Sequence, residues 1–99
     1  MPPQSLLAET GRIQHSVDIV YYDYLLRSEK DPERFYTGFT KDLKRRLTEY
    51  NRSRQGYSKQ YAPWVLTWYC GFRDESRARQ FEVYLKSGSG RAFIHKHFS

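Results

Sequence analysis

One acidic residue lies inside the apolar face of a helix predicted in the last third of the chain. Ala78, Phe81 and Leu85 are spaced at i, i+3 and i+7, and form an apolar stripe. Glu82 lies four residues after Ala78, within that stripe. A carboxylate that faces a core costs several kcal/mol unless it is paired or bound to a metal ion. Two interpretations follow: a salt bridge to an arginine of an earlier helix, or a ligand for Mg²⁺ or Mn²⁺, which one carboxylate, waters and a substrate phosphate can hold.

A cation flanks the apolar face of an earlier predicted helix, over residues 40–51. At 100° per residue, Arg46 lies about 80° from the shared direction of Leu43 and Leu47, and Tyr50 lies about 40° from it. A guanidinium suits a phosphate because its planar fork donates two hydrogen bonds and keeps its charge. The alternative is an ordinary solvated helix flank.

Tyrosines are concentrated on two predicted strands that precede this helix. Tyr22 and Tyr24 share one face of the strand over residues 19–27, where Asp23 points to the opposite face. Tyr36 and Gly38 lie together on the strand over residues 34–39. Packing across the sheet is the alternative explanation for any single tyrosine.

A small fold that combines strands and helices is needed to bring these residues together. The two strands are joined by a polar turn with Asp-Pro at residues 28–33, which predicts an antiparallel hairpin. Thr40 is the expected N-cap of the first helix, and residues 51–63 are expected to form a mobile basic loop. Residues 64–72 read as a third strand, expected to be the central one because so much of it is apolar.

The rest of the chain is expected to be helical. Asp74 can cap a helix that runs to about residue 87, the Ser-Gly-Ser-Gly run at 87–90 breaks it, and residues 92–98 form a last short helix. The predicted order is β-β-α-β-α-α, an α+β fold with a three-stranded antiparallel sheet flanked by helices. Residues 1–16 are expected to be a flexible tail and residues 17–99 the domain.

Composition narrows the class of partner. The 99 residues fit one domain, and a net charge of +6 favours nucleic acid first and an acidic membrane surface second. The single cysteine, Cys70, excludes an intrachain disulfide. No leader peptide or membrane span is apparent, so a cytoplasmic location without membrane contact is expected.

The order of these features resembles the GIY-YIG nucleases, in particular their small single-domain members. Tyr22-Asp23-Tyr24 and Tyr36-Thr37-Gly38 are similar to the two halves of the family signature. Arg46 follows Tyr36 by ten positions, as in the family, and the runs at 61–64 and 81–91 also resemble such members. The resemblance implies phosphodiester cleavage with one divalent metal, Mg²⁺ or Mn²⁺.

The resemblance also implies residue roles. Tyr24 and Tyr36 would meet the nucleophilic water and the scissile phosphate, with the choice of general base between them left open. Arg46 would steady the phosphate charge, Glu82 would hold the metal, and Tyr50 falls where many members have histidine. Asp23 departs from the family, which usually has an apolar residue there, and would destabilise the strand if it faced the core.

The expected function is a metal-dependent endonuclease that acts on nucleic acid, with DNA favoured over RNA. Low sequence specificity or a preference for a flap, branch or single strand is expected, because no second domain is apparent for reading a target. The alternatives are a non-cleaving nucleic-acid-binding module and an assembly scaffold on the same fold. The candidate nucleic-acid contacts are Gly38, Lys44, Arg45, Arg52, Arg54, Tyr57 and Lys59.

Overall fold

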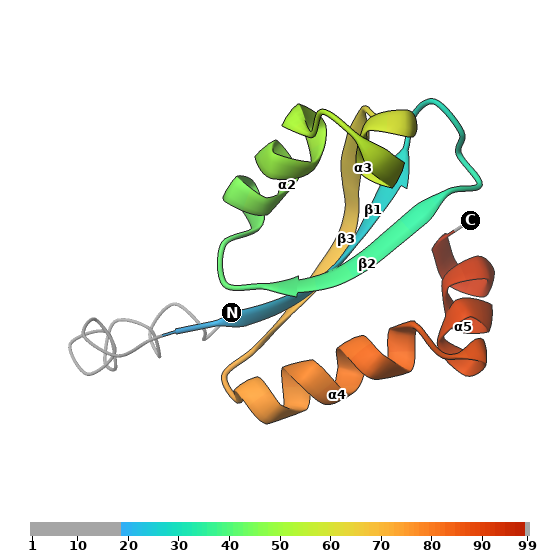
Figure 1. Cartoon of the computed structure of the whole chain (residues 1–99). Helices are drawn as coiled ribbons and strands as arrows, with labels where there is room; N and C mark the ends of the chain where they lie inside the picture. The colour runs from blue at the N-terminus through green and yellow to red at the C-terminus, as the bar shows by residue number, and fades with distance from the viewer. Residues whose placement is uncertain (1–18, 99) are drawn as a thin grey trace, which may run out of the picture.

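The computed structural model describes residues 19–98, so the predicted tail at 1–16 lies outside the described residues. A three-stranded antiparallel sheet forms the middle layer, in the order β2-β1-β3 (Figure 1). Helices α2 and α3 cover one face of the sheet, and α4 and α5 cover the other (Figure 1). The elements are β1 (Tyr21–Ser28), β2 (Phe35–Thr40), α2 (Leu43–Arg52), α3 (Gly56–Gln60), β3 (Trp64–Phe72), α4 (Glu75–Leu85) and α5 (Gly88–Phe98). The predicted fold class is confirmed.

The strand β1 supplies the core on both faces of the sheet. On the α2 face, Tyr24 and Leu26 pack with Trp64, and Leu43 and Leu47 of α2 close over them as predicted. On the α4 face, a second cluster contains the buried residues Leu25, Leu85 and Ile94. Alternation of side chains along one strand therefore fixes which helix covers which face.

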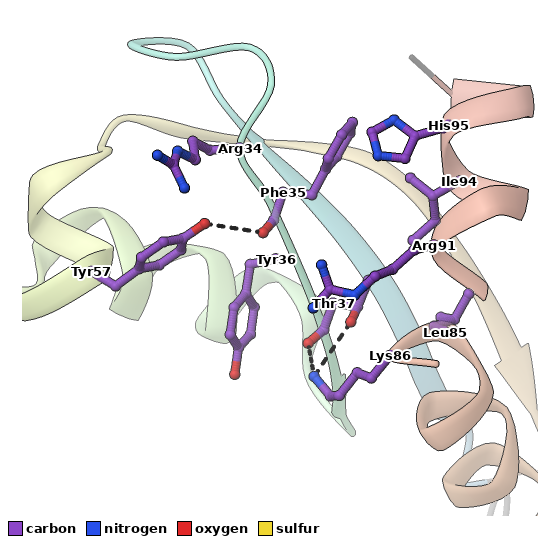
Figure 2. A pocket seen from close by; sticks show the side chains of 10 residues that line it. All are labelled: Arg34, Phe35, Tyr36, Thr37, Tyr57, Leu85, Lys86, Arg91, Ile94 and His95. Carbon is purple, nitrogen blue, oxygen red and sulfur yellow. Dashed lines mark hydrogen bonds between the residues drawn. The ribbon is translucent and has the colours of Figure 1, made fainter. Parts of the chain in front are cut away.

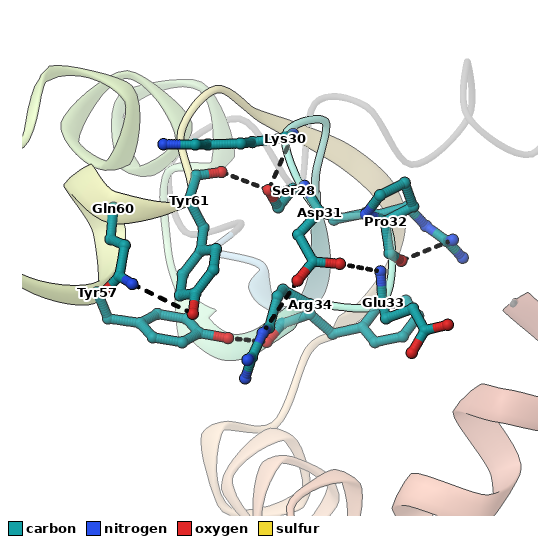
Figure 3. A network of polar contacts seen from close by, with 11 residues as sticks. Ser28, Lys30, Asp31, Pro32, Glu33, Arg34, Tyr57, Gln60 and Tyr61 are labelled. Carbon is teal, nitrogen blue, oxygen red and sulfur yellow. Dashed lines mark hydrogen bonds and ion pairs between the residues drawn. The ribbon is translucent and has the colours of Figure 1, made fainter.

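The predicted hairpin is confirmed, and its turn is tied to the segment before β3. The hydroxyl of the fully buried Ser28 accepts hydrogen bonds from the backbone N–H of Lys30 and Asp31, at 3.1 and 2.9 Å, and donates to the carbonyl of Tyr61 at 2.5 Å (Figure 3). Arg34 closes the turn through its backbone N–H to the carbonyl of Asp31, at 2.8 Å. This network holds the β1–β2 turn against the chain that leads into β3.

The prediction of a mobile basic loop at 51–63 is wrong in part, because α3 forms within it. Trp64 explains the difference: its indole N–H donates to the carbonyl of Ser58 at 2.8 Å, and its ring lies 5.6 Å from that of Tyr57. The side chain of Asn51 also pairs with both backbone polar groups of Trp64. Contacts with Trp64, which follows the segment 51–63, thus order a segment that has no periodic pattern of apolar residues.

The third strand has the predicted span but is an edge strand, which corrects its expected central place. Val65 and Tyr69 are exposed on it, whereas β1 pairs with both neighbours. Apolar content alone could not distinguish a central strand from an edge strand, because β3 carries aromatic residues on its exposed face as well as on its covered face.

Two helix starts also differ from prediction. Asp42, not Thr40, caps α2, since its carboxylate accepts from the backbone N–H of Arg45 at 3.0 Å, while Thr40 ends β2. Helix α5 begins at Gly88 instead of residue 92, and Ser87 accepts from the backbone N–H of Gly90. The break predicted at 87–90 is therefore also the start of a helix. Asp74 caps α4 as predicted.

Candidate active site

A cleft of about 540 Å³ lies over the edge formed by β2, between α2 and α4. Tyr36 and Gly38 of β2, Arg46 of α2 and Glu82 of α4 line it together. These four residues come from both faces of the sheet, and they meet because β2 is an edge strand over which groups from either side can extend. The sequence predicted one pocket shared by Tyr24, Tyr36, Arg46 and Glu82. The last three line this cleft, whereas Tyr24 is fully buried and does not, which corrects its predicted contact with the water or the phosphate.

The guanidinium of Arg46 is held from two sides. Its Nη1 donates to the hydroxyl of Tyr24 at 3.3 Å, and its Nε lies 3.2 Å from a carboxylate oxygen of Glu49. Tyr24 is fully buried behind the cleft and does not line it. It therefore orients the arginine from below, which leaves the rest of the guanidinium for a ligand in the cleft.

Three phenols form a cluster beneath Arg46. The ring of Tyr36 lies 4.7 Å from that of Tyr50 and 6.5 Å from that of Tyr24. Burial raises the pKa of Tyr24 above its usual value, and the neighbouring Arg46 offsets this in part. Burial raises the pKa of Tyr50 as well, with hydrogen bonding to Tyr36 as the next cause. Both phenols are consequently protonated at neutral pH and act as hydrogen-bonding groups.

Glu82 is half-buried and faces the cleft. Within residues 19–98 it forms no ion pair, and Arg45 and Arg46 of α2 pair with Glu49 instead. The salt bridge considered as an alternative is therefore not made. An unpaired carboxylate in a polar cleft fits a hard cation such as Mg²⁺. No cluster of three or more acidic, histidine or cysteine ligands occurs in the described part of the chain, so an ion here would depend on water and substrate oxygens.

Asp23 points to the α4 face and is fully buried, with both carboxylate oxygens lacking hydrogen-bond partners. Burial, and next the charge of Glu82, raise its pKa from 3.8 to about 7, while Arg79 and Lys86 lower it. The residue expected to destabilise the strand if it faced the core does face it. It lies in the layer between the sheet and the helix that carries Glu82.

Asp23→Asn is expected to stabilise the protein at pH 8 but not at pH 4. The folded-state pKa of Asp23 lies above its unfolded value, so wild-type stability falls as pH rises from about 4 to about 7. Asparagine cannot ionise, and its advantage should grow over this range to as much as about 4 kcal/mol. Urea unfolding of both proteins in EDTA at pH 4, 6 and 8 measures the difference. An advantage that is constant with pH would show that Asp23 does not ionise with this pKa.

Gly38 allows the buried tyrosine to reach Arg46. A Cβ at this position would lie 2.2 Å from the hydroxyl oxygen of Tyr24, directly across the hairpin. The ring cannot retreat easily, because it is fully buried and bonded to Arg46. The absence of a side chain at Gly38 therefore permits the close approach of Tyr24. Gly38 also forms part of the cleft wall.

Gly38→Ala is expected to lower the free energy of unfolding by about 1–3 kcal/mol through overpacking. Chemical denaturation checks this against the wild type and against Gly88→Ala, where an added Cβ meets nothing within 4 Å. A loss below about 0.5 kcal/mol would mean that Tyr24 moves aside without cost.

The predicted nucleic-acid contacts are distributed over several surfaces. Arg45 lines the cleft and, with Lys44 and Arg52, a shallower hollow along α2. Tyr57 lies in a separate pocket beyond Tyr36. Arg54 and Lys59 are exposed and line none of these three cavities.

Sequence reasoning missed Arg79, which lines the cleft three residues before Glu82 on α4. Its guanidinium carbon lies 3.9 Å from the ring centroid of Phe39. The i, i+3 spacing from Glu82 is the signal that could have identified it, since residues three apart share a helix face.

The family model described as the GIY-YIG catalytic domain matches residues 20–95. The chain therefore belongs to the GIY-YIG family of nucleases, and the family resemblance predicted from the sequence is confirmed. Nucleases of this family are generally dependent on divalent metals and act on nucleic acid. Neither a curated protein nor a solved structure matches the chain. Among residues 19–98, none of the helices has the length and apolar character needed to cross a bilayer.

Proposed function

We propose that this protein is a divalent-metal-dependent endonuclease that hydrolyses phosphodiester bonds of DNA in the cleft at the β2 edge. One observation carries the proposal: an unpaired carboxylate, Glu82, and an oriented guanidinium, Arg46, line one cleft from opposite faces of the sheet. Phosphodiester hydrolysis needs neutralised phosphoryl charge and a stabilised leaving oxygen, and a bound cation with an arginine can supply both.

The roles follow from the positions of the side chains. Glu82 would hold Mg²⁺ or Mn²⁺, which when bound supplies Lewis-acid stabilisation of the leaving oxygen. Arg46 binds a non-bridging phosphate oxygen, and Tyr24 is a positioning residue that fixes the guanidinium. Tyr36 lies in the cleft wall, where its hydroxyl can contact the attacking water, and Tyr50 packs against its ring.

The charges around the cleft suit recognition of a nucleic acid through its phosphate backbone. The three carboxylates of its lining, Asp42, Glu49 and Glu82, are outnumbered by four cations, Lys41, Arg45, Arg46 and Arg79, in a chain with a net charge of +6. Such cations address phosphates, which position a nucleic acid without reading its sequence. Low sequence specificity is therefore part of the proposal.

A nicking assay tests the function. Purified protein is incubated with supercoiled plasmid, branched DNA and RNA, each with Mg²⁺, Mn²⁺ or EDTA. Nicking of DNA that requires the metal supports the proposal, and preferential cleavage of RNA would reassign the substrate. Binding without nicking under every condition would replace the enzyme with a non-cleaving nucleic-acid-binding module.

Arg46→Ala is expected to lower the nicking rate by about 10²-fold, as removal of a transition-state charge partner does elsewhere. Arg77→Ala is the matched control, because Arg77 is an exposed arginine of α4 that does not line the cleft. Equal rates for the two variants would remove Arg46 from the mechanism.

A further inference from the structure

A second hollow, of about 560 Å³, adjoins the cleft on the far side of Tyr36 (Figure 2). It lies between the β2 edge, α3 and the α4–α5 corner. Tyr57 stands at one wall, with Lys86 and Arg91 at the opposite wall and Arg34 and His95 near the top of the view (Figure 2). We call this hollow the Tyr57–Arg91 pocket.

The lining of the Tyr57–Arg91 pocket is basic and aromatic. Arg34, Lys86, Arg91 and His95 belong to it, and none of its ten lining residues is acidic. Arg91 is exposed and forms no ion pair with any residue between 19 and 98. A cationic wall of this kind favours a phosphate, because arginine donates two parallel hydrogen bonds to it.

Hydrogen bonds of Lys86 and Tyr57 give the pocket a defined shape. The ammonium of Lys86 donates to the carbonyl and hydroxyl oxygens of Thr37, at 2.5 and 3.3 Å, and lies 5.0 Å from the ring centroid of Tyr36. The hydroxyl of Tyr57 donates to the carbonyl of Phe35 at 3.4 Å (Figure 2). The pocket therefore has a fixed cation on one side and a half-exposed aromatic ring on the other.

Tyr36 connects the pocket to the cleft, because it lines both. A nucleic-acid strand that placed one phosphodiester beside Arg46 would carry its neighbouring nucleotide past Tyr36 into the pocket. A base that is paired and stacked in a duplex cannot enter a hollow between side chains, whereas an unpaired base can stack on aromatic rings there.

We propose that the Tyr57–Arg91 pocket binds an unpaired nucleotide adjacent to the scissile phosphodiester, so that the substrate is DNA with a single-stranded segment, such as a flap. Binding of the unpaired nucleotide rests on the pocket itself, and its place next to the scissile bond rests on the proposed function. The sugar–phosphate contacts Arg91 and Lys86, and the base stacks against Tyr57.

Binding is tested in EDTA, where no cleavage can occur. Fluorescence anisotropy compares a labelled single-stranded oligodeoxynucleotide with a blunt duplex of the same length, at one low salt concentration. We expect tighter binding of the single strand, and a loss of about 10-fold for it in Arg91→Ala with less than about 2-fold for the duplex. Lys96→Ala is the control, because it removes one charge from the same helix but does not line the pocket.

Cleavage mapping then separates the two proposals. The wild type with Mg²⁺ is expected to cut a 5′ or 3′ flap within one or two nucleotides of the junction, and Arg91→Ala to lose this preference while still nicking plasmid. Equal losses for single strand and duplex in Arg91→Ala would overturn the pocket and leave the nuclease intact, as would a selective loss of single-strand binding in Lys96→Ala as large as that in Arg91→Ala. A selective loss of single-strand binding in a protein that never cleaves would preserve the pocket and overturn the nuclease.

Discussion

Replacing Glu82 by glutamine is expected to lower the rate of Mg²⁺-dependent nicking at least about 10³-fold. Glutamine keeps the size of the side chain but removes the only acidic group of α4 that lines the cleft with Arg46. A cation bound through Glu82 would lose this carboxylate, and with it the transition-state stabilisation that the ion would supply. Initial rates of plasmid nicking, measured over a range of Mg²⁺ concentrations, give the size of the loss.

The same substitution should leave the fold intact, which separates a lost ligand from a lost structure. Glu82 is one cause of the raised pKa of Asp23, so its neutralisation removes a repulsion and is expected to keep or raise the melting temperature. Glu75→Gln is the control, since Glu75 is an exposed acid of the same helix outside the cleft. Nicking by Glu82→Gln within 10-fold of the wild type would refute the assigned role.

Gly90→Ala is expected to lower the free energy of unfolding by at least about 3 kcal/mol. A Cβ on Gly90 would lie 1.9 Å from the carbonyl oxygen of Tyr84 and 2.6 Å from Cα of Leu85. These are backbone atoms at the end of α4, so relief requires that α5 move away from α4. Leu85 and Ile94 would then separate, and they form the core on this face.

Gly88→Ala provides a matched comparison at the start of the same helix. A Cβ on Gly88 meets nothing within 4 Å, so alanine there should be neutral or stabilising by up to about 1 kcal/mol. Urea unfolding of the two variants measures the contrast. Similar stabilities for Gly88→Ala and Gly90→Ala would show that the α4–α5 corner is not packed as closely as described.

Local pattern was sufficient to predict most of the fold. Alternation along residues 19–27 placed Tyr24 and Leu26 on one face and Leu25 on the other, and the third strand and the cap at Asp74 were also predicted correctly. The order of strands was not predictable in this way, because an apolar run is compatible with a central strand and with an edge strand that carries exposed aromatics. Helix α3 likewise depends on Trp64, which lies outside it in sequence.

The site was predictable where one helix or strand determines the direction of a side chain. Glu82 and Arg46 stood out because a charged group lay in or beside an apolar stripe, and both line the cleft. The Tyr57–Arg91 pocket was not predictable, because its cations come from the β1–β2 turn, the end of α4, and α5. No periodicity relates residues of such separate elements, and only tertiary packing brings them together.

The proposed nuclease activity requires a cation in the cleft between α2 and α4, and paramagnetic broadening by Mn²⁺ tests this most directly. Mn²⁺ is titrated into ¹⁵N-labelled protein, and amide signals are followed in the wild type and in Glu82→Gln. We predict that broadening begins at cleft residues of β2, α2 and α4, including Gly38, Arg46 and Glu82. The signal of Val65, on the edge strand β3, should be spared. The broadening should disappear in Glu82→Gln. Broadening centred on His95 and His97, or unchanged by Glu82→Gln, would contradict the account.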